Sequence, residues 1–168
     1  GSVDEAKGFP LSIEAARLLS ADDGMDCYVR AIVRSDTEDW LVRLIEQIRG
    51  ERATLFENIM DDAEFKAFLA LGDVFVCPYL PSAFARRTSG MVVDAIILGR
   101  PFVAIEGTWL GDLARDTGAG IAARADAVSI VAAVKTIIAD YPAYCAKAAD
   151  ARGRYLLENS WSTLLQTI

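Results

Sequence analysis

The stretch from Asp73 to Val103, DVFVCPYLPSAFARRTSGMVVDAIILGRPFV, constrains the fold more than any other part of this sequence. Its pattern indicates a short apolar strand over Val74–Val76, a Pro-rich loop, an apolar helix over Met91–Leu98 and a second strand over Phe102–Ile105. A helix between two such strands is typical of a βαβ unit, whose strands run parallel. In open parallel sheets, ligands bind at the carboxyl ends of strands, often on the N-terminus of the next helix. The stretch therefore predicts a parallel α/β fold and a place for an anion where the helix opens, at Gly90.

Helical and strand patterns alternate along the rest of the chain. Helices are predicted over Leu11–Leu19, Thr37–Ile48, Ala63–Leu71, Leu110–Asp116, Ala125–Ile138, Pro142 to about Leu157, and Trp161–Ile168. Strands are predicted over Asp26–Val33, Arg52–Phe56 and Gly120–Ala123. We expect one Rossmann-like, doubly wound parallel sheet of five or six strands in a three-layer α/β/α domain covering residues 3–168. Gly1-Ser2 is typical of a cloning scar and is left out of the argument.

Composition limits the classes of ligand and location. The net charge of −7, from 17 basic and 24 acidic residues, argues against a nucleic-acid polymer as partner, because phosphate backbones select basic surfaces. The sequence has no histidine, so the commonest general base and metal ligand is missing, and no metal site is expected. No apolar run reaches the roughly 20 residues of a membrane span. We expect a cytoplasmic protein in which Cys27, Cys77 and Cys145 are buried, reduced thiols.

The order of these motifs resembles the C-terminal, donor-nucleotide-binding half of GT-B glycosyltransferases. It is most similar to the large retaining family, glycosyl transferases group 1 or family-four-like, that includes sucrose, glycogen and mannosyl transferases. The shared features are the Lys7-Gly8 pair and the segments "GDVFVCP", "SGMVVDAIILGRPFVA" and "GDLARDTGAGI". The resemblance runs from Lys7 to about Trp161. It implies the Rossmann-like fold already expected from the pattern.

The resemblance also implies a donor site. Lys7 matches the lysine that reaches the donor diphosphate. Ser89, Gly90 and Met91 match the helix start whose backbone N–H groups approach the phosphates. Asp94 matches the second of two glutamates set eight residues apart, which binds the ribose hydroxyls of the nucleotide in that family.

Other positions match less closely. Thr108-Trp109 replace the small glycines of the family's loop, and Asp112 matches the acidic residue after it. Arg86 stands where the family has its first glutamate, which contacts the donor sugar, and it joins Arg87 as a candidate for the diphosphate. The family's phosphate arginine would fall at Ser2. The chain is therefore expected to begin just inside the domain, without its first strand and without the N-terminal acceptor domain.

The resulting hypothesis is a sugar-nucleotide-binding domain of a metal-independent glycosyltransferase, inactive by itself, that needs no cofactor beyond its nucleoside diphosphate sugar. The enzyme must stabilise the charge that grows on the diphosphate as the sugar bond breaks. Three alternatives stay open at this point. Arg86 favours a degenerate, non-catalytic GT-B-like scaffold. A GT-B-shaped epimerase also handles sugar nucleotides but relies on histidine. A signalling receiver domain requires an acidic cluster at the strand ends, which the sequence lacks.

Overall fold

The structure is a computed structural model that describes residues 3–21, 25–35, 37–48 and 53–160. Its helices are α1 Phe9–Ser20, α2 Asp39–Ile48, α3 Asp62–Ala70, α4 Pro81–Phe84, α5 Gly90–Leu98, α6 Trp109–Thr117, α7 Ala127–Ala139 and α8 Tyr141–Glu158. Its strands are β1 Cys27–Arg30, β2 Ala53–Phe56, β3 Phe75–Cys77, β4 Phe102–Ile105 and β5 Gly120–Ala123. The helix predicted over Trp161–Ile168 lies outside the described residues.

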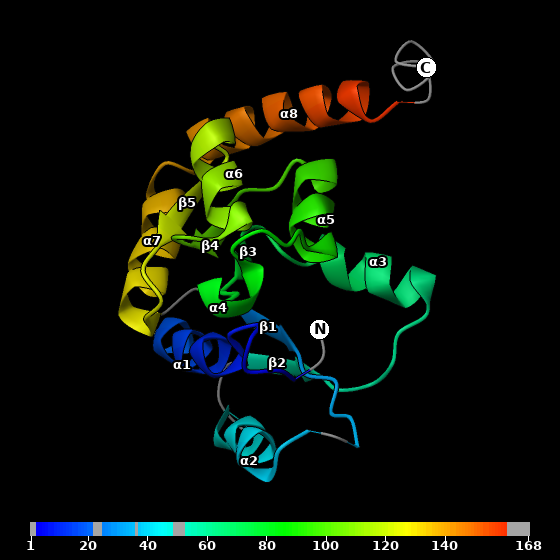
Figure 1. The fold of residues 1–168 in the computed structure, drawn as a ribbon, viewed down its shortest axis with the longest axis vertical. Coiled ribbons are helices and arrows are strands. Elements are labelled where there is room, and N and C mark those ends of the chain that lie inside the picture. The colour runs from blue at the N-terminus through cyan, green and yellow to red at the C-terminus, as the bar shows by residue number, and fades with distance from the viewer. Residues whose placement is uncertain (1–2, 22–24, 36, 49–52, 161–168) are drawn as a thin grey trace.

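All strand pairs in the described residues are parallel, which confirms the parallel α/β class. They form two ladders, a two-stranded sheet β1–β2 and a three-stranded sheet in the order β3–β4–β5. The single continuous sheet expected from the sequence is thus divided between β1 and β3. Figure 1 shows the small sheet next to α1 and α2, and the larger sheet between α7 and α5.

Helices cover both faces of these strands. On one face, α1 packs with α7 against β4 and β5 through Ala15 and Leu19. The other end of α1 packs with α2 against β1 and β2 through Phe9 and Ile13. On the opposite face, α5, α6 and α8 cover β3 and β4, and Phe68 of α3 meets the ring of Phe56 at 5.0 Å. Helix α1 therefore joins the two sheets on one face, and Phe68 of α3 joins them on the other.

Local sequence explains where the helices begin and end. Asp61 accepts hydrogen bonds from the N–H groups of Ala63 and Glu64, and the Glu64 carboxylate returns to Asp61 N–H, so a capping box starts α3. Gly99 and Gly118 end α5 and α6 in the left-handed conformation, with φ of 64° and 63°. The strand bounds of β4 and β5 match the predicted ones.

Two sequence expectations need correction. The segment of α4 is predicted to be part of a loop, but the structure forms a four-residue helix there that begins at Pro81. A helix this short has too few positions to show a helical period in the sequence. The cysteines are free thiols, but only Cys77 is buried, where desolvation raises its pKa to about 12; Cys27 and Cys145 are half-buried. Among the described helices, none alone is long and apolar enough to cross a membrane, and only α7 with α8 passes that test together, across a 93° bend.

The contact between α6 and β4 gives a first prediction. A Cβ on Gly111 would lie 2.4 Å from the carbonyl oxygen of Ile105, whereas a Cβ on Gly153 of α8 meets nothing within 4 Å. We expect Gly111→Ala to lower the free energy of unfolding by about 1–3 kcal/mol, because the backbones must separate. The matched change Gly153→Ala should raise it by about 0.5–1 kcal/mol through helix propensity. Urea unfolding measures both; equal effects would contradict this packing.

Candidate functional site

Most of the predicted site residues lie near the carboxyl ends of β1, β3 and β4. Gly8 starts this arrangement: its φ is 64°, and a Cβ there would lie 1.8 Å from the carbonyl oxygen of Pro78. Only glycine fits such an approach. Two residues before Gly8, the carbonyl oxygen of Ala6 accepts a hydrogen bond of 2.9 Å from Leu80 N–H. These contacts hold Lys7, which lies between Ala6 and Gly8, beside the end of β3.

The N-terminus of α5 lies at the same edge. Ser89 is the N-cap residue and is 8% exposed, yet its side chain makes no capping hydrogen bond. Gly90 is exposed, and a Cβ there would meet nothing within 4 Å. The first N–H groups of a helix have no partner within it, and the dipole places about half a positive charge there. The start of α5 is therefore exposed and carries no side-chain cap, and its binding of an anion stays a prediction.

Tyr79 belongs to this site although it was not among the predicted donor-binding residues. Tyr79 is half-buried at this edge, and the centre of its ring lies 4.5 Å from the centre of the Phe84 ring. Burial raises the pKa of Tyr79, so its hydroxyl stays protonated at neutral pH. An aromatic residue after a strand is more often a packing residue. The sequence signal for Tyr79 is its position two residues after the end of β3, at the edge where ligands bind in parallel sheets.

The loop after β4 lies at the same edge of the sheet, next to α4. Gly107 has a φ of 74°, and a Cβ there would lie 3.6 Å from Pro81 Cγ, so this loop touches α4. The Thr108 side chain is fully buried, donates to Ile105 O at 2.6 Å and accepts from Gly111 N–H at 3.0 Å. Its hydroxyl therefore caps α6. Trp109 is 36% exposed at the start of that helix.

The remaining predicted residues differ in exposure. Arg86 and Arg87 are exposed in the loop between α4 and α5, and the Arg87 guanidinium lies 5.0 Å from the centre of the Phe84 ring. Met91 is half-buried and packs against the core of the larger sheet. The exposed Asp112 carboxylate pairs with Arg115 one helical turn later.

Asp94 needs a correction of its place in the helix. The helix predicted over Met91–Leu98 places Asp94 in its first turn, where an acid serves the helix dipole. Helix α5 instead begins at Gly90 and has no acidic residue in its first turn. Asp94 is half-buried, and desolvation raises the pKa of its carboxyl. Desolvation disfavours the ionised form of this carboxyl, and no ion pair of Asp94 is among the described contacts. Such a carboxyl is a candidate for ligand binding. The described residues hold no group of three or more His, Cys, Asp or Glu that would bind a metal ion.

The sequence of this chain matches those of known proteins. Residues 1–140 match the family described as "Glycosyl transferases group 1". The chain is 30% identical to a glycogen synthase of Mycobacterium tuberculosis over 129 residues, which are 76% of this chain and 30% of that protein. The chain thus spans about a third of the length of the relative it matches.

Solved structures agree on the fold. HepE of Anabaena, crystallised in complex with UDP, has a TM-score of 0.79 at 17% identity, over 99% of this chain and 45% of that one. Sucrose-phosphate synthase of Thermosynechococcus elongatus has a TM-score of 0.76 at 20% identity, over 99% and 42%. The C-terminal domain of LpcC from Francisella tularensis has a TM-score of 0.74 at 17% identity, over 91% and 80%.

The environment of Asp94 predicts a pH-dependent stability. A folded-state pKa above the unfolded value means that ionised Asp94 lowers stability, and that this penalty grows as pH rises above about 4. Asp94→Asn should therefore raise the urea midpoint at pH 7, with a gain that shrinks towards pH 3.5.

Asp126 supplies the control of opposite sign. Hydrogen bonds from Ser129 lower the pKa of Asp126, so its contribution is present above the unfolded pKa and is lost as pH falls. Asp126→Ala should lower the urea midpoint at pH 7 and lower it less at pH 3.5. An Asp94→Asn effect that does not change with pH would contradict the role of desolvation.

Proposed function

The chain belongs to the glycosyl transferases group 1 family, and from that premise we propose that it binds the diphosphate of a sugar nucleotide at the N-terminus of α5. The full protein would transfer the sugar from this donor to an acceptor. The acceptor would be held by a further domain, since the chain spans 30% of the glycogen synthase that it matches.

The observation that carries the proposal is the open start of α5. Apart from its chain neighbours and the backbone of α5 itself, Gly90 has no heavy atom within 4 Å of where a Cβ would stand, so a phosphate has room to approach the start of the helix. The helix dipole is worth about 0.3–2 kcal/mol for an anion. That is too little for a diphosphate with more than one negative charge, so further positive charge is required. Lys7 is held at the same edge by the contact of Gly8 with Pro78 and supplies it.

These groups act during transfer as well as in binding. As the bond between the sugar and the diphosphate breaks, negative charge grows on the leaving diphosphate. The N–H groups of α5 are fixed by the helix, so they need no reorganisation to stabilise this charge. Lys7 would add positive charge from the same edge. We propose that the transfer therefore needs no metal ion. The free thiols of Cys27, Cys77 and Cys145 support the further proposal that it takes place in the cytoplasm.

The remaining predicted residues take supporting roles in this proposal. Asp94 lies one turn inside α5 and would accept hydrogen bonds from the ribose hydroxyls. These hydrogen bonds would offset the free-energy cost of ionising a partly desolvated carboxyl. Arg86 and Arg87 are exposed beside the helix start and would reach the outer phosphate or the sugar. Trp109 would border the sugar from the loop after β4. Thr108 would act through its backbone, because its hydroxyl already makes two hydrogen bonds.

UDP is the first nucleotide to test, because HepE was crystallised with UDP and with UDP and glucose. We expect the chain to bind UDP, with an affinity that is the same in EDTA and in magnesium. Gly90→Ala should weaken binding at least about tenfold, since a methyl group at the helix start hinders the phosphate. Isothermal titration calorimetry measures both.

Gly153→Ala is the matched control, because it is also a helical glycine with open space around it. It should leave the affinity for UDP unchanged. Urea unfolding of both variants checks that neither loses stability. Equal affinity of the Gly90→Ala variant and the unaltered chain, or binding only with magnesium, would contradict the proposal.

A further inference from the structure

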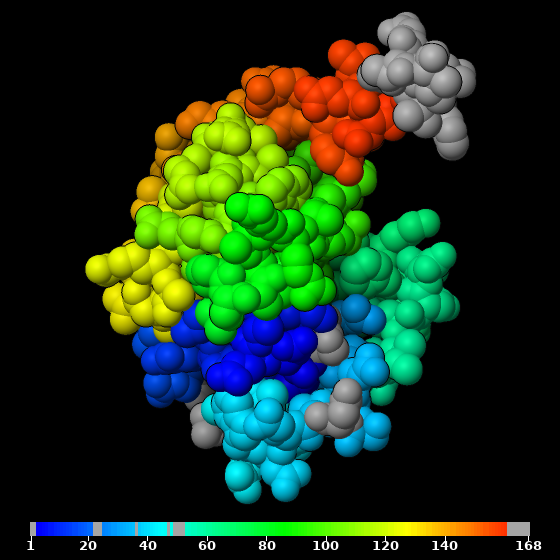
Figure 2. Space-filling view, in the orientation of Figure 1, coloured from blue at the N-terminus to red at the C-terminus, as the bar shows by residue number. Residues whose placement is uncertain are grey.

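The loop between α4 and α5 concentrates positive charge in an acidic chain. Figure 2 shows the segments of α4 and α5, in green, at the surface between α1, in blue, and α6, in yellow-green. From position 74 to position 93 the sequence has no Asp or Glu, and its only charged residues are Arg86 and Arg87. Both are exposed, although the chain has a net charge of −7. Neighbouring like charges repel each other, and an anionic ligand relieves that repulsion.

No acidic side chain among the described residues neutralises these two arginines. Arg86 makes no side-chain hydrogen bond or ion pair in the described contacts, and Arg87 makes only a contact with the ring of Phe84. Other arginines of the chain do have carboxylate partners, in the pairs Arg100–Asp73, Arg115–Asp112 and Arg124–Asp126. The loop therefore offers two cations whose hydrogen-bonding groups are available to a ligand.

A pair of aromatic rings supports Arg87. The Phe84 side chain is buried, and the centre of its ring lies 4.5 Å from the centre of the Tyr79 ring, just after β3. The Arg87 guanidinium lies 5.0 Å from the centre of the Phe84 ring. A guanidinium that stacks on a ring keeps the N–H donors in its own plane available. Arg87 thus presents a supported fork of donors, which matches the two oxygens of a carboxylate.

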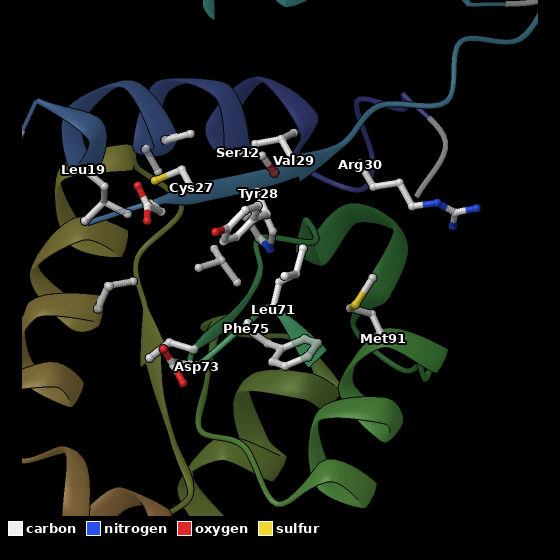
Figure 3. A pocket seen from close by; sticks show the side chains of 18 of the residues that line it. Ser12, Leu19, Cys27, Tyr28, Val29, Arg30, Leu71, Asp73, Phe75 and Met91 are labelled. Atoms are coloured by element: carbon white, nitrogen blue, oxygen red, sulfur yellow. The ribbon is translucent and has the colours of Figure 1, made fainter. Parts of the chain in front are cut away.

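The two arginines lie away from the cavity beside Lys7. This cavity, of about 630 Å³ between β1 and β3, is lined by residues that include Lys7, and Met91 borders it from α5 (Figure 3). Arg86, Arg87 and Trp109 are not among the described residues that line it. A diphosphate held by Lys7 and the start of α5 would therefore have the cavity on one side and the α4 side, with the arginines, on the other.

The α4 side has room and contacts for one sugar ring. At the start of α4, Pro81 Cγ lies 3.6 Å from where a Cβ on Gly107 would stand, and the exposed Trp109 follows two residues later. At the end of α4, Phe84 supports Arg87. A helix rises about 1.5 Å per residue, so the two ends of this short helix are about 5 Å apart. That span is comparable to the width of a pyranose ring.

The diphosphate by itself does not account for both arginines. Each phosphate of a sugar nucleotide carries a negative charge, and the start of α5 together with Lys7 supplies positive charge against them. A neutral sugar on the α4 side would leave Arg86 and Arg87 without a counter-charge. A carboxylate on the sugar would provide one, in the planar form that a guanidinium binds through two parallel hydrogen bonds.

We propose that the donor is the nucleotide of a sugar acid, whose transferred sugar carries a carboxylate, and that Arg87 binds this carboxylate while Arg86 adds positive charge beside it. The inference rests on the proposed function, because it names the class of sugar that follows the diphosphate at the start of α5. It concerns selectivity for the donor and adds no chemical step to the transfer.

The test compares UDP-glucuronic acid with UDP-glucose, which differ only in a carboxylate in place of a hydroxymethyl group. Isothermal titration calorimetry of the chain measures the affinity for each, and for UDP. We expect UDP-glucuronic acid to bind at least about tenfold more tightly than UDP-glucose, since hydrogen bonds between charged groups are stronger than those to a neutral hydroxyl. This preference should shrink as the salt concentration rises, because salt screens exposed charges.

Substitutions assign the preference to the loop. Arg87→Gln should remove most of it and leave the affinity for UDP-glucose within about twofold, and Arg87→Lys should keep only part, because lysine has the charge without the fork. Arg86→Gln should reduce the preference less than Arg87→Gln. Arg154→Gln is the matched control: it changes the net charge equally at an exposed position of α8, and the preference should stay.

The outcomes separate this inference from the site on which it rests. Binding of UDP with equal affinities for the two sugar nucleotides would overturn the inference and leave the diphosphate site standing. A preference that survives Arg87→Gln would also overturn it. So would an equal loss of affinity for UDP and both sugar nucleotides in Arg87→Gln, because the arginine would then serve the phosphates. No binding of UDP would contradict the proposed function, and the inference with it.

Discussion

The approach of Gly8 to the carbonyl oxygen of Pro78 is the contact on which the other features depend. It fixes where α1 begins, and α1 then packs against β1 and β2 with one end and against β4 and β5 with the other. It also sets Lys7 beside the end of β3. A side chain at position 8 has no room, so the Lys-Gly order serves both the fold and the proposed site.

The two sheets are held together by helices rather than by strand pairing. Helix α1 bridges them on one face, and Phe68 of α3 lies against Phe56 of the small sheet on the other. Parallel pairing puts the carboxyl ends of β3 and β4 at one edge, and α5 and α6 begin after these strand ends. Family membership places the chain among glycosyltransferases, so the scaffold, epimerase and receiver alternatives are not favoured.

The sequence predicted most elements because their signals are local. The apolar run Phe102–Ile105 and the glycine after α5 are such signals, and both are confirmed. The division of the sheet was not predicted, because it depends on which strands meet in space. The capping role of the Thr108 hydroxyl was missed for a similar reason, since its partners lie in the folded loop. The predicted contacts of Lys7, Arg86 and Asp94 with a donor stay predictions.

The most direct test of the central claim is a map of backbone amide NMR shifts as UDP is added to the chain. Binding at the start of α5 predicts the largest shifts at Gly90 and Met91, with smaller shifts at Lys7 and Gly8. Helix α8, remote from this edge, should not respond. Shifts confined to the cavity between β1 and β3, or spread evenly over the surface, would contradict a diphosphate site at this helix.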